Sequence, residues 1–282
     1  MNRSRGFTLI ELIVVVVILG VVGVGIASFV RSSMQIYIDV GEREQLLTES
    51  RFALERLSRE LRTAVPNSVR LSGNSTEHCI EFVPINWSSV YTVLPLQPSS
   101  DTLLEIVFPM DIDGNVFQFS GGDNFAVVYP LRPSDVYDAS NQKRQLISAC
   151  SDDGDGDCST KENGVETMDL TVASSFPEAS PASRAYLVNR SVSFCVTGGR
   201  LVRFENDIVA AQASSPVNSP IIAEHVVNTL SPNPALAPGV DDPFRIFEAS
   251  LQANAVVQIR LRFEDNEEII GYQQEVHLAN VP

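Results

Sequence analysis

The stretch of sequence that decides the fold is GFTLIELIVVVVILGVVGVGIASFV, residues 6–30. Within residues 7–30 only Thr8, Glu11 and Ser28 are clearly polar. As a helix, this run would extend about 36 Å, more than the roughly 30 Å of a membrane's hydrocarbon core. The sequence therefore predicts a membrane-spanning helix over this run.

The residues that flank the apolar run set its orientation. Arg3 and Arg5 precede it, so the positive-inside rule predicts a cytoplasmic N-terminus and an exported chain after Val30. A secretory signal peptide would need a shorter apolar core followed by a small-residue cleavage site, and the run reaches Arg31 without one. We therefore expect a retained membrane anchor and an exported head.

Glu11 needs an explanation, because a carboxylate inside an apolar membrane helix costs about 3 kcal/mol even on lenient insertion scales. Gly6, Phe7 and Glu11, at this spacing ahead of a long apolar run, resemble the class III signal of type IV prepilins and type II secretion pseudopilins. The resemblance implies that prepilin peptidase cleaves between Gly6 and Phe7 and that Phe7 is then N-methylated. It also implies that Glu11 pairs with the N-terminal amine of a neighbouring subunit during assembly, since two buried opposite charges offset each other.

The helix is expected to continue beyond the membrane in amphipathic form and to end before Pro66. The apolar and small residues that recur at three- and four-residue spacing are Leu46, Ser50, Ala53, Leu54, Leu57, Leu61 and Ala64. The predicted organisation is a prepilin leader over 1–6, a transmembrane and assembly helix over 7–30, its amphipathic continuation over 31–65, and an exported β-rich head over 66–282.

Short runs rich in Val, Ile and Phe, bounded by Gly, Pro, Asn and Ser, predict strands in the head. These runs are 69–71, 79–83, 102–109, 125–130, 144–149, part of 185–196 and 200–205. Gly198-Gly199 predicts a two-residue hairpin turn, and clean alternation on both sides of residues 265–267 predicts a closing hairpin. A long helix followed by antiparallel strands is an α+β order, and it agrees with the pilin fold.

Three further stretches carry a narrower resemblance. Residues 51–62 are similar to the same region of minor pilins and of the larger minor pseudopilins, and residues 221–226 resemble large members of both groups. Residues 274–282 are similar to the closing stretch of minor prepilins of the mannose-sensitive haemagglutinin (MSHA) pilus. The resemblance implies a minor pilin of an MSHA-type pilus that takes part in pilus assembly, and the size of the head suggests initiation or the filament tip.

Two alternatives stay open. The chain could be a type II secretion minor pseudopilin, which would share the whole N-terminal helix. It could also be a pilus-associated adhesin whose head binds a surface or a glycan through aromatics around Trp87 and Tyr91, although these residues equally suit sheet packing.

The resemblance also implies partners and a location. The partners are prepilin peptidase, other major and minor pilins and the inner-membrane pilus assembly platform. The chain would be a single-pass protein of the bacterial inner membrane, with its head in the periplasm, and then part of the filament on the cell surface. The formal net charge of −15 argues against nucleic acid as a partner, because phosphate binding needs clustered Lys and Arg.

The four cysteines, Cys79, Cys150, Cys158 and Cys195, indicate two disulfides in an exported chain. Four cysteines allow three pairings. Cys150 and Cys158 enclose a short loop of a size that suits one disulfide, and this leaves Cys79 to pair with Cys195.

The short loop between the second and third cysteines contains Asp152, Asp153, Asp155 and Asp157. Carboxylates at this density are a candidate calcium site, with a solvated acidic loop tip as the alternative.

The sequence gives no indication of an enzyme. His78, His225 and His277 are scattered, and no nucleophile-elbow, phosphate-loop or zinc-protease motif is present. We expect no catalytic site and no cofactor apart from the candidate calcium.

Overall fold

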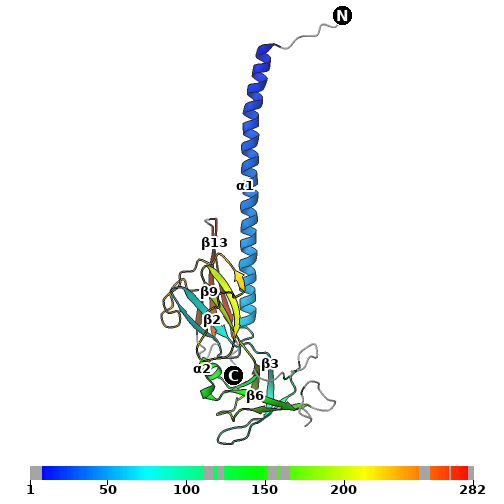
Figure 1. The fold of residues 1–282 in the computed structure, drawn as a ribbon, viewed down its shortest axis with the longest axis vertical. Coiled ribbons are helices and arrows are strands. Elements are labelled where there is room, and N and C mark those ends of the chain that lie inside the picture. The colour runs from blue at the N-terminus through cyan, green and yellow to red at the C-terminus, as the bar shows by residue number, and fades with distance from the viewer. Residues whose placement is uncertain are drawn as a thin grey trace.

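The structure is a computed structural model of the 282-residue chain. It describes residues 8–110, 117, 119, 124–151, 158, 166–247, 255–266 and 268–278. A long helix, α1, carries an elongated head on its second half, and its first half projects free of the head (Figure 1). The arrangement is α+β and pilin-like, as the sequence predicts.

Helix α1 runs without interruption over Leu9–Leu61, 53 residues or about 80 Å. Thr8 caps its N-terminus, because the hydroxyl accepts a hydrogen bond from the backbone N–H of Glu11 at 3.3 Å. Burial begins only at Leu46 and follows the predicted face. The buried residues of α1 are Leu46, Ser50, Ala53, Leu54, Leu57, Ser58 and Leu61.

The helix ends at Leu61, about one turn before the predicted end at residue 65. Val65 donates its backbone N–H to the carbonyl oxygen of Val83 at 2.8 Å, and Ala64 forms an antiparallel bridge with Pro84. Pairing with the head therefore takes these residues out of the helix.

Two antiparallel sheets pack with the second half of α1, and we call this assembly the pilin unit. The first sheet has the order β1-β2-β9-β10-β11 and the second has the order β12-β13-β14. Their strands are β1 (Arg70–Asn74), β2 (Glu77–Phe82), β9 (Ser191–Thr197), β10 (Arg200–Asn206), β11 (Ile221–Ala223), β12 (Phe244–Phe247), β13 (Val256–Asp265) and β14 (Glu268–His277). Gly198 and Gly199, both at positive φ, form the predicted turn between β9 and β10, and β13 and β14 form the predicted closing hairpin.

The core of the pilin unit lies between α1 and the inner faces of the two sheets. Leu57 and Leu61 of α1 are fully buried in one cluster with Ile80, Phe194 and Phe263 from the strands. Burial of each such side chain stabilises the fold by about 1.5–3 kcal/mol. The amphipathic half of α1 is therefore an integral part of the head.

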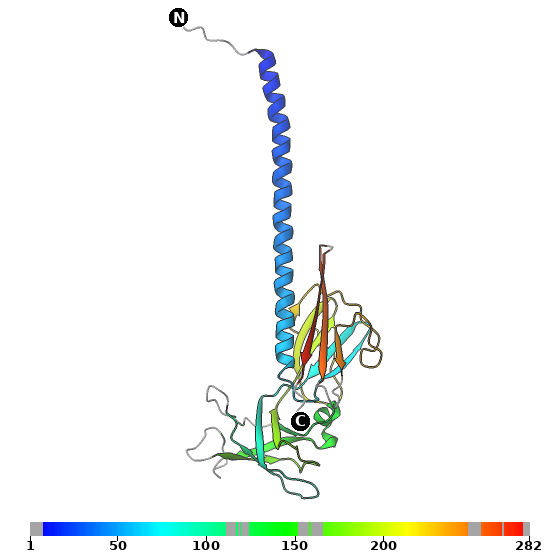
Figure 2. The ribbon, with the colours of Figure 1, turned by 180° about the vertical axis from the view of Figure 1, so that it is seen from behind.

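The chain between β2 and β9 forms a second unit, a closed barrel with the order β3-β4-β7-β6-β5-β8. Its elements are β3 (Trp87–Val93), β4 (Leu103–Val107), β5 (Phe125–Val128), α2 (Pro133–Tyr137), the 3-10 helix η1 (Ala139–Asn141), β6 (Arg144–Ser151), β7 (Thr167–Val172) and β8 (Arg184–Val188). Leu104, Ile106, Leu170 and Leu187 belong to its own buried core. Figures 1 and 2 show the barrel beyond the end of α1, at the pole of the head farthest from the free half of the helix.

The barrel is inserted between two neighbouring strands of the pilin unit. β2 and β9 pair antiparallel, and Phe82 lies opposite Val192 at the end where the barrel begins and ends. A buried apolar cluster, here called the junction cluster, joins the two units. It consists of Val65, Val83, Val127, Val136, Tyr137, Tyr186, Val188 and Ile208. The single predicted head over 66–282 thus comprises two units with a shared apolar contact.

Candidate functional site

The first turn of α1 presents Glu11, which the sequence predicts to be an assembly residue. Its carboxylate lies at the helix N-terminus, where the helix dipole favours a negative charge. The side chain is exposed and forms no ion pair with any residue of the described ranges. Gly6 and Phe7, the predicted cleavage and methylation residues, lie outside the residues that the structure describes.

The apolar part of α1 is long enough to cross a membrane by length and composition, and none of it is buried against the head. The helix continues unbroken through Gly20, Gly23 and Gly25. A Cβ atom added at any of these glycines would meet nothing within 4 Å. Small residues on an exposed helix surface allow another helix to approach closely. This segment therefore suits both a membrane anchor and a helix-packing surface.

Beyond Val30 the helix stays exposed as far as Gln45, and we call residues 31–45 the neck. The neck extends about 22 Å past the predicted end of the membrane span. Met34, Tyr37 and Ile38 are each more than half exposed there. Large apolar side chains on a water-exposed helix usually face a core, and the described part of the chain provides none for this segment.

Met34 and Ile38 belong to a stripe of residues spaced alternately by four and three. The stripe, here called the outward face, consists of Ala27, Arg31, Met34, Ile38, Gly41, Gln45, Thr48 and Phe52. Its members line shallow grooves along the helix surface. At 3.6 residues per turn the stripe lies on the side of α1 opposite Leu54 and Leu61, which pack into the head. This face is absent from the sequence-based predictions, because its spacing becomes informative only once the buried side of α1 is known.

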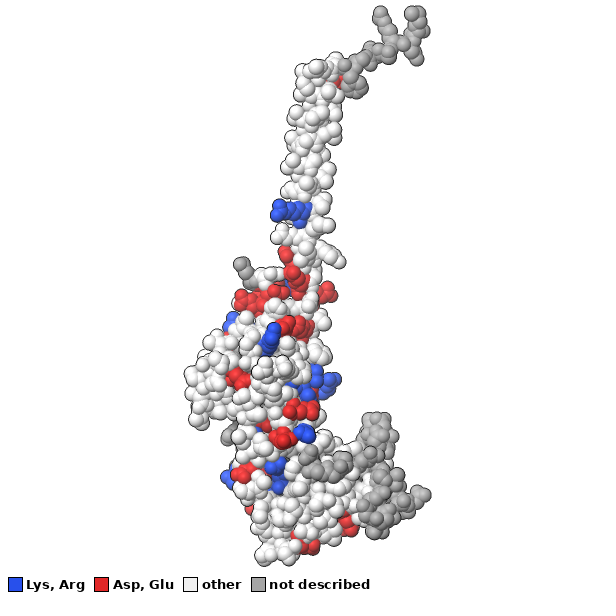
Figure 3. All heavy atoms as spheres, viewed as in Figure 1, with Lys and Arg blue, Asp and Glu red and all other residues white. Residues whose placement is uncertain are grey.

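The tip of the β13–β14 hairpin braces the lower neck. Glu268 pairs with Arg43 at 3.1 Å, and Asn266 donates a hydrogen bond to Glu42. These residues line a groove together with Asp39 and others, and acidic side chains gather at this level of the helix in Figure 3. Exposed pairs of this kind contribute less than about 1 kcal/mol each. They therefore fix the position of the hairpin tip beside the neck more than they stabilise the fold.

The structure contains two disulfides, Cys79–Cys195 and Cys150–Cys158, which are the two pairs that the cysteine spacing favours. Cys79 and Cys195 lie directly opposite each other on β2 and β9, with 4.1 Å between their Cα atoms. The bond therefore links the two strands from which the barrel is inserted, across a sequence separation of 116.

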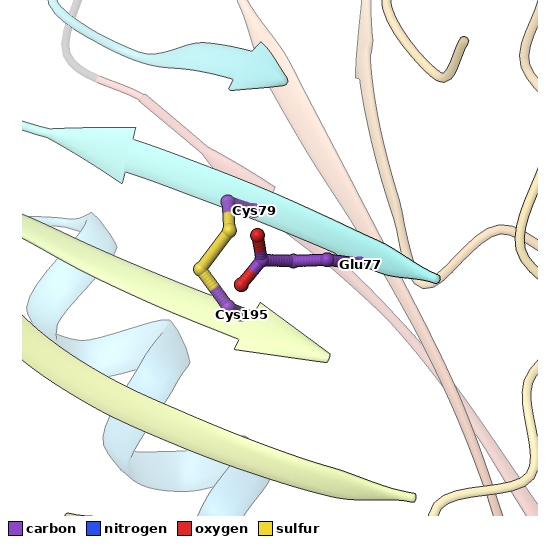
Figure 4. A group of neighbouring side chains, drawn as sticks. All are labelled: Glu77, Cys79 and Cys195. Carbon is purple, nitrogen blue, oxygen red and sulfur yellow. A yellow bond between two sulfur atoms is a disulfide. The ribbon is translucent and has the colours of Figure 1, made fainter. Parts of the chain in front are cut away.

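The carboxylate of Glu77 lies beside the Cys79–Cys195 bond, as Figure 4 shows. In the described part of the chain, these three residues form the group whose ligand atoms come close enough to hold a metal ion. The two sulfurs are bonded to each other, so they are not free to bind a metal. Glu77 instead accepts a hydrogen bond from the backbone N–H of Ser215 at 2.9 Å, which fastens the loop after β10 over the disulfide.

Other residues singled out by the sequence have ordinary structural surroundings or lie outside the described ranges. Trp87 and Tyr91 are half-buried and pack against the barrel core, so they do not form an exposed aromatic surface. His225 and His277 are exposed, whereas His78 is buried. The candidate calcium ligands Asp152, Asp153, Asp155 and Asp157 lie outside the described residues.

A buried ionic group lies at the junction between the two units. Arg70 pairs with Glu81 at 2.8 Å, and its guanidinium lies 3.5 Å from the ring centroid of Tyr137. Burial raises the pKa of Glu81 above its ordinary value, although hydrogen bonds from Ser191 and Arg70 and the charge of Arg70 oppose the shift. Burial also raises the pKa of Tyr137 well above its ordinary range. Arg70 thus stabilises a carboxylate that burial alone would disfavour in its ionised form.

Comparison with known proteins bears on the N-terminal segment. Residues 1–27 match the family model of the prokaryotic N-terminal methylation motif. Searches among curated proteins and among solved structures found no match to the chain. The matched motif contains Gly6, Phe7 and Glu11, and it indicates a type IV pilin-like or pseudopilin-like protein that prepilin peptidase processes.

Proposed function

We propose that this type IV pilin-like chain is a minor subunit of an MSHA-type pilus and that it acts in pilus assembly, at initiation or at the filament tip. Its role is structural rather than catalytic. Its partners are the other major and minor pilins and the inner-membrane assembly platform, and it passes from the inner membrane into the surface filament.

The observation that carries this proposal is the exposed outward face of the neck. The apolar side chains of Met34 and Ile38 lie beyond the predicted membrane span and are not covered by the described part of the head. Because α1 is anchored at one end, the surface that covers them must lie alongside it. Another anchored helix that runs in the same direction meets this requirement, and a second pilin-like subunit supplies one.

The barrel supports a minor rather than a major role. It adds a complete second unit beyond the pilin unit, at the pole farthest from the free half of α1 (Figure 2). A repeating subunit with this bulk would crowd its neighbours along a thin filament, whereas a subunit at the tip has free space beyond it. The MSHA assignment rests on the resemblance of residues 274–282 described above.

The primary test is intact-mass analysis of the protein in sheared filaments and in membranes, with quantification against the major pilin. We expect a species that begins at N-methylated Phe7, present in filaments at far below one copy per major subunit. Protein that begins at Met1 in peptidase-competent cells would overturn the prepilin assignment. Equal abundance with the major pilin would overturn the minor role, and retention in membranes with loss of protein secretion in a deletion strain would favour a pseudopilin.

A pair of neck variants tests the outward face. Ile38→Gln places an amide on that face, whereas Ile36→Gln makes the same change on the opposite side of the helix, and the two side chains are similarly exposed. We expect Ile38→Gln to reduce the amount of protein in filaments several-fold while Ile36→Gln leaves it near the wild-type amount. Equal effects of the two variants would argue against a packing surface confined to the outward face.

A further inference from the structure

The loop between β11 and β12 crosses from the first sheet to the second, and a buried histidine fastens its middle to β2. His78 is 1% exposed and Asp242, near the end of this loop, is 2% exposed. The imidazole Nε2 lies 2.8 Å from the carbonyl oxygen of Ser231, and Nδ1 lies 3.5 Å from Oδ1 of Asp242. No function proposed above uses this contact.

Asp242 is held in one orientation by its own hydrogen bonds. Oδ1 accepts the backbone N–H of Ser231 at 2.9 Å, and Oδ2 accepts the hydroxyl of Ser231 at 2.7 Å and the backbone N–H of Gly239 at 2.6 Å. Both carboxylate oxygens therefore act as acceptors, and Asp242 ties Ser231 and Gly239 of the loop segment 231–242 to one side chain. The orientation that results directs Oδ1 toward His78.

The protonation state of His78 decides the sign of its contact with Asp242. A carbonyl oxygen can only accept, so Nε2 must carry the hydrogen that it shares with Ser231. In a neutral ring, Nδ1 then carries a lone pair that faces a carboxylate oxygen, and Nδ1 has no hydrogen-bond partner among the described residues. Protonation places an N–H at Nδ1, which changes two opposed acceptors into a charge-assisted contact.

Neither of the residues paired with His78 on the neighbouring strands carries a charge. On β1 the residue paired with His78 is Gly73, and on β9 it is Val196. A Cβ atom at Gly73 would lie 2.7 Å from Cδ2 of the imidazole, so the glycine makes room for the ring.

The other charged groups of the loop and of β12 bind partners other than His78. Arg245 of β12 donates to the carbonyl oxygen of Gly239 at 2.7 Å. Asp241 pairs with Arg262 at 2.9 Å. The carboxylate of Asp242 is thus the charge that lies against the imidazole.

We propose that His78 and Asp242 form a pH-sensitive latch, which holds the loop segment 231–242 on β2 when the imidazole is protonated and loosens it when the imidazole is neutral. The latch goes beyond the proposed role in assembly, because it concerns the link between the two sheets inside one subunit. Protonation of Nδ1 turns two opposed acceptors into an attraction, so we expect closure of the loop to weaken as pH rises and the imidazole becomes neutral.

Selective ¹⁵N labelling of histidine in the full chain, in detergent micelles, provides a direct readout, since the sequence contains only three imidazoles. His225→Gln and His277→Gln assign the two exposed rings and leave the signal of His78. Hydrogen exchange of peptides from residues 228–243, corrected for the intrinsic pH dependence of exchange, reports loop opening between pH 5 and pH 8, where histidine ordinarily changes charge.

We expect loop exchange to accelerate by up to about tenfold per pH unit over the range in which the His78 signal titrates. Asp242→Asn is the informative variant, because it removes the carboxylate charge and its NH2 can donate to a neutral Nδ1, at the cost of the acceptor for the backbone N–H of Ser231. We expect that variant to lose most of the pH dependence and to protect the loop less than the wild type does at low pH. His277→Gln, which removes an exposed histidine, should retain the wild-type profile.

Two results would overturn the latch. One is loop protection in the wild type that stays constant while the His78 signal titrates. The other is the same pH dependence in Asp242→Asn as in the wild type, which would place its origin in another group.

Discussion

Removal of the Cys79–Cys195 disulfide tests whether the barrel and the pilin unit unfold together. The change is the double substitution Cys79→Ala and Cys195→Ala, which leaves no free thiol. A disulfide stabilises a fold mainly because it restricts the unfolded chain, and the effect grows with the logarithm of the loop that it closes. The sequence separation here is 116, so removal should destabilise a chain that unfolds completely by about 5 kcal/mol.

A different value follows if the barrel stays folded while the pilin unit unfolds. Trp87 and Leu187 are paired neighbours in the barrel. A barrel that stays folded would hold them together, so only the chain outside the barrel would count toward the loop that the disulfide closes. The effective loop would then contain about 16 residues, and the loss would be about 3 kcal/mol. The junction cluster is shared by both units, so we expect the larger value.

The assay is urea unfolding of the mature chain in detergent micelles, followed both by circular dichroism and by fluorescence. The chain contains a single tryptophan, Trp87, and it lies in the barrel, so fluorescence reports that unit while circular dichroism reports the whole chain. We expect coincident transitions for wild type and variant. Cys150→Ala with Cys158→Ala is the matched control, and its separation of 8 predicts a loss of only about 2.5 kcal/mol.

Separate transitions from the two probes would refute the single unfolding unit. A loss smaller than that of the control would refute the loop-entropy reasoning itself.

Four further substitutions, one with a matched control, test the packing and the buried charges. Leu57→Ala should destabilise the fold by about 2–5 kcal/mol in urea unfolding, whereas Phe52→Ala on the outward face should change stability by no more than about 0.5 kcal/mol. Arg70→Met leaves Glu81 buried without its partner, so the same assay should show a loss of about 3–5 kcal/mol; a loss below 1 kcal/mol would contradict the buried-pair account. Burial raises the pKa of Glu81, so the folded chain favours the protonated carboxyl. The contribution of Glu81 to stability should therefore fall as pH rises from 4.5, its ordinary pKa, through its raised pKa in the folded chain. Glu81→Gln should flatten that part of the profile of stability against pH. Gly73→Ala should destabilise the β1–β2 hairpin by about 1–3 kcal/mol, because its Cβ would lie 2.5 Å from a backbone oxygen across the hairpin; a wild-type midpoint would show that the strand shifts freely.

The helix and the closing hairpin could be predicted from sequence because their signals are local. The recurrence of Leu46, Leu54, Leu57 and Leu61 defines one helix face whatever packs against it. Gly198-Gly199 defines a turn for the same reason, since both residues adopt positive φ.

The barrel could not be predicted, because its closure depends on pairings between distant strands. β7 carries a local signal, in which Met168, Leu170 and Val172 alternate inward, but the strand prediction omits it. β3, β11 and β12 are omitted as well, and the polar outward residues of β3 weaken its apolar pattern. Even a complete strand list would not show that β3 pairs with both β4 and β8.

The candidate functional site also contains some residues that the sequence identifies and others that it does not. Glu11 is recognisable because it is a carboxylate at a fixed distance from a glycine and an aromatic residue in an apolar run. The outward face could not be recognised from the sequence, because it can be identified only once the structure shows which face of α1 is buried. The contact between His78 and Asp242 joins residues 164 positions apart, about which the sequence spacing carries no information.

The insertion of the barrel between β2 and β9 has a mechanical consequence. Both connections leave the first sheet at the same end, so tension applied to the barrel is divided between two adjacent strands and acts to peel them apart pair by pair. The bond between Cys79 and Cys195 lies three residue pairs inside that end, after the pairs that begin with Phe82 and Val192. Separation of the strands stops at the covalent bond. Under tension the attachment of the barrel would therefore lengthen by a few residues and then resist further extension.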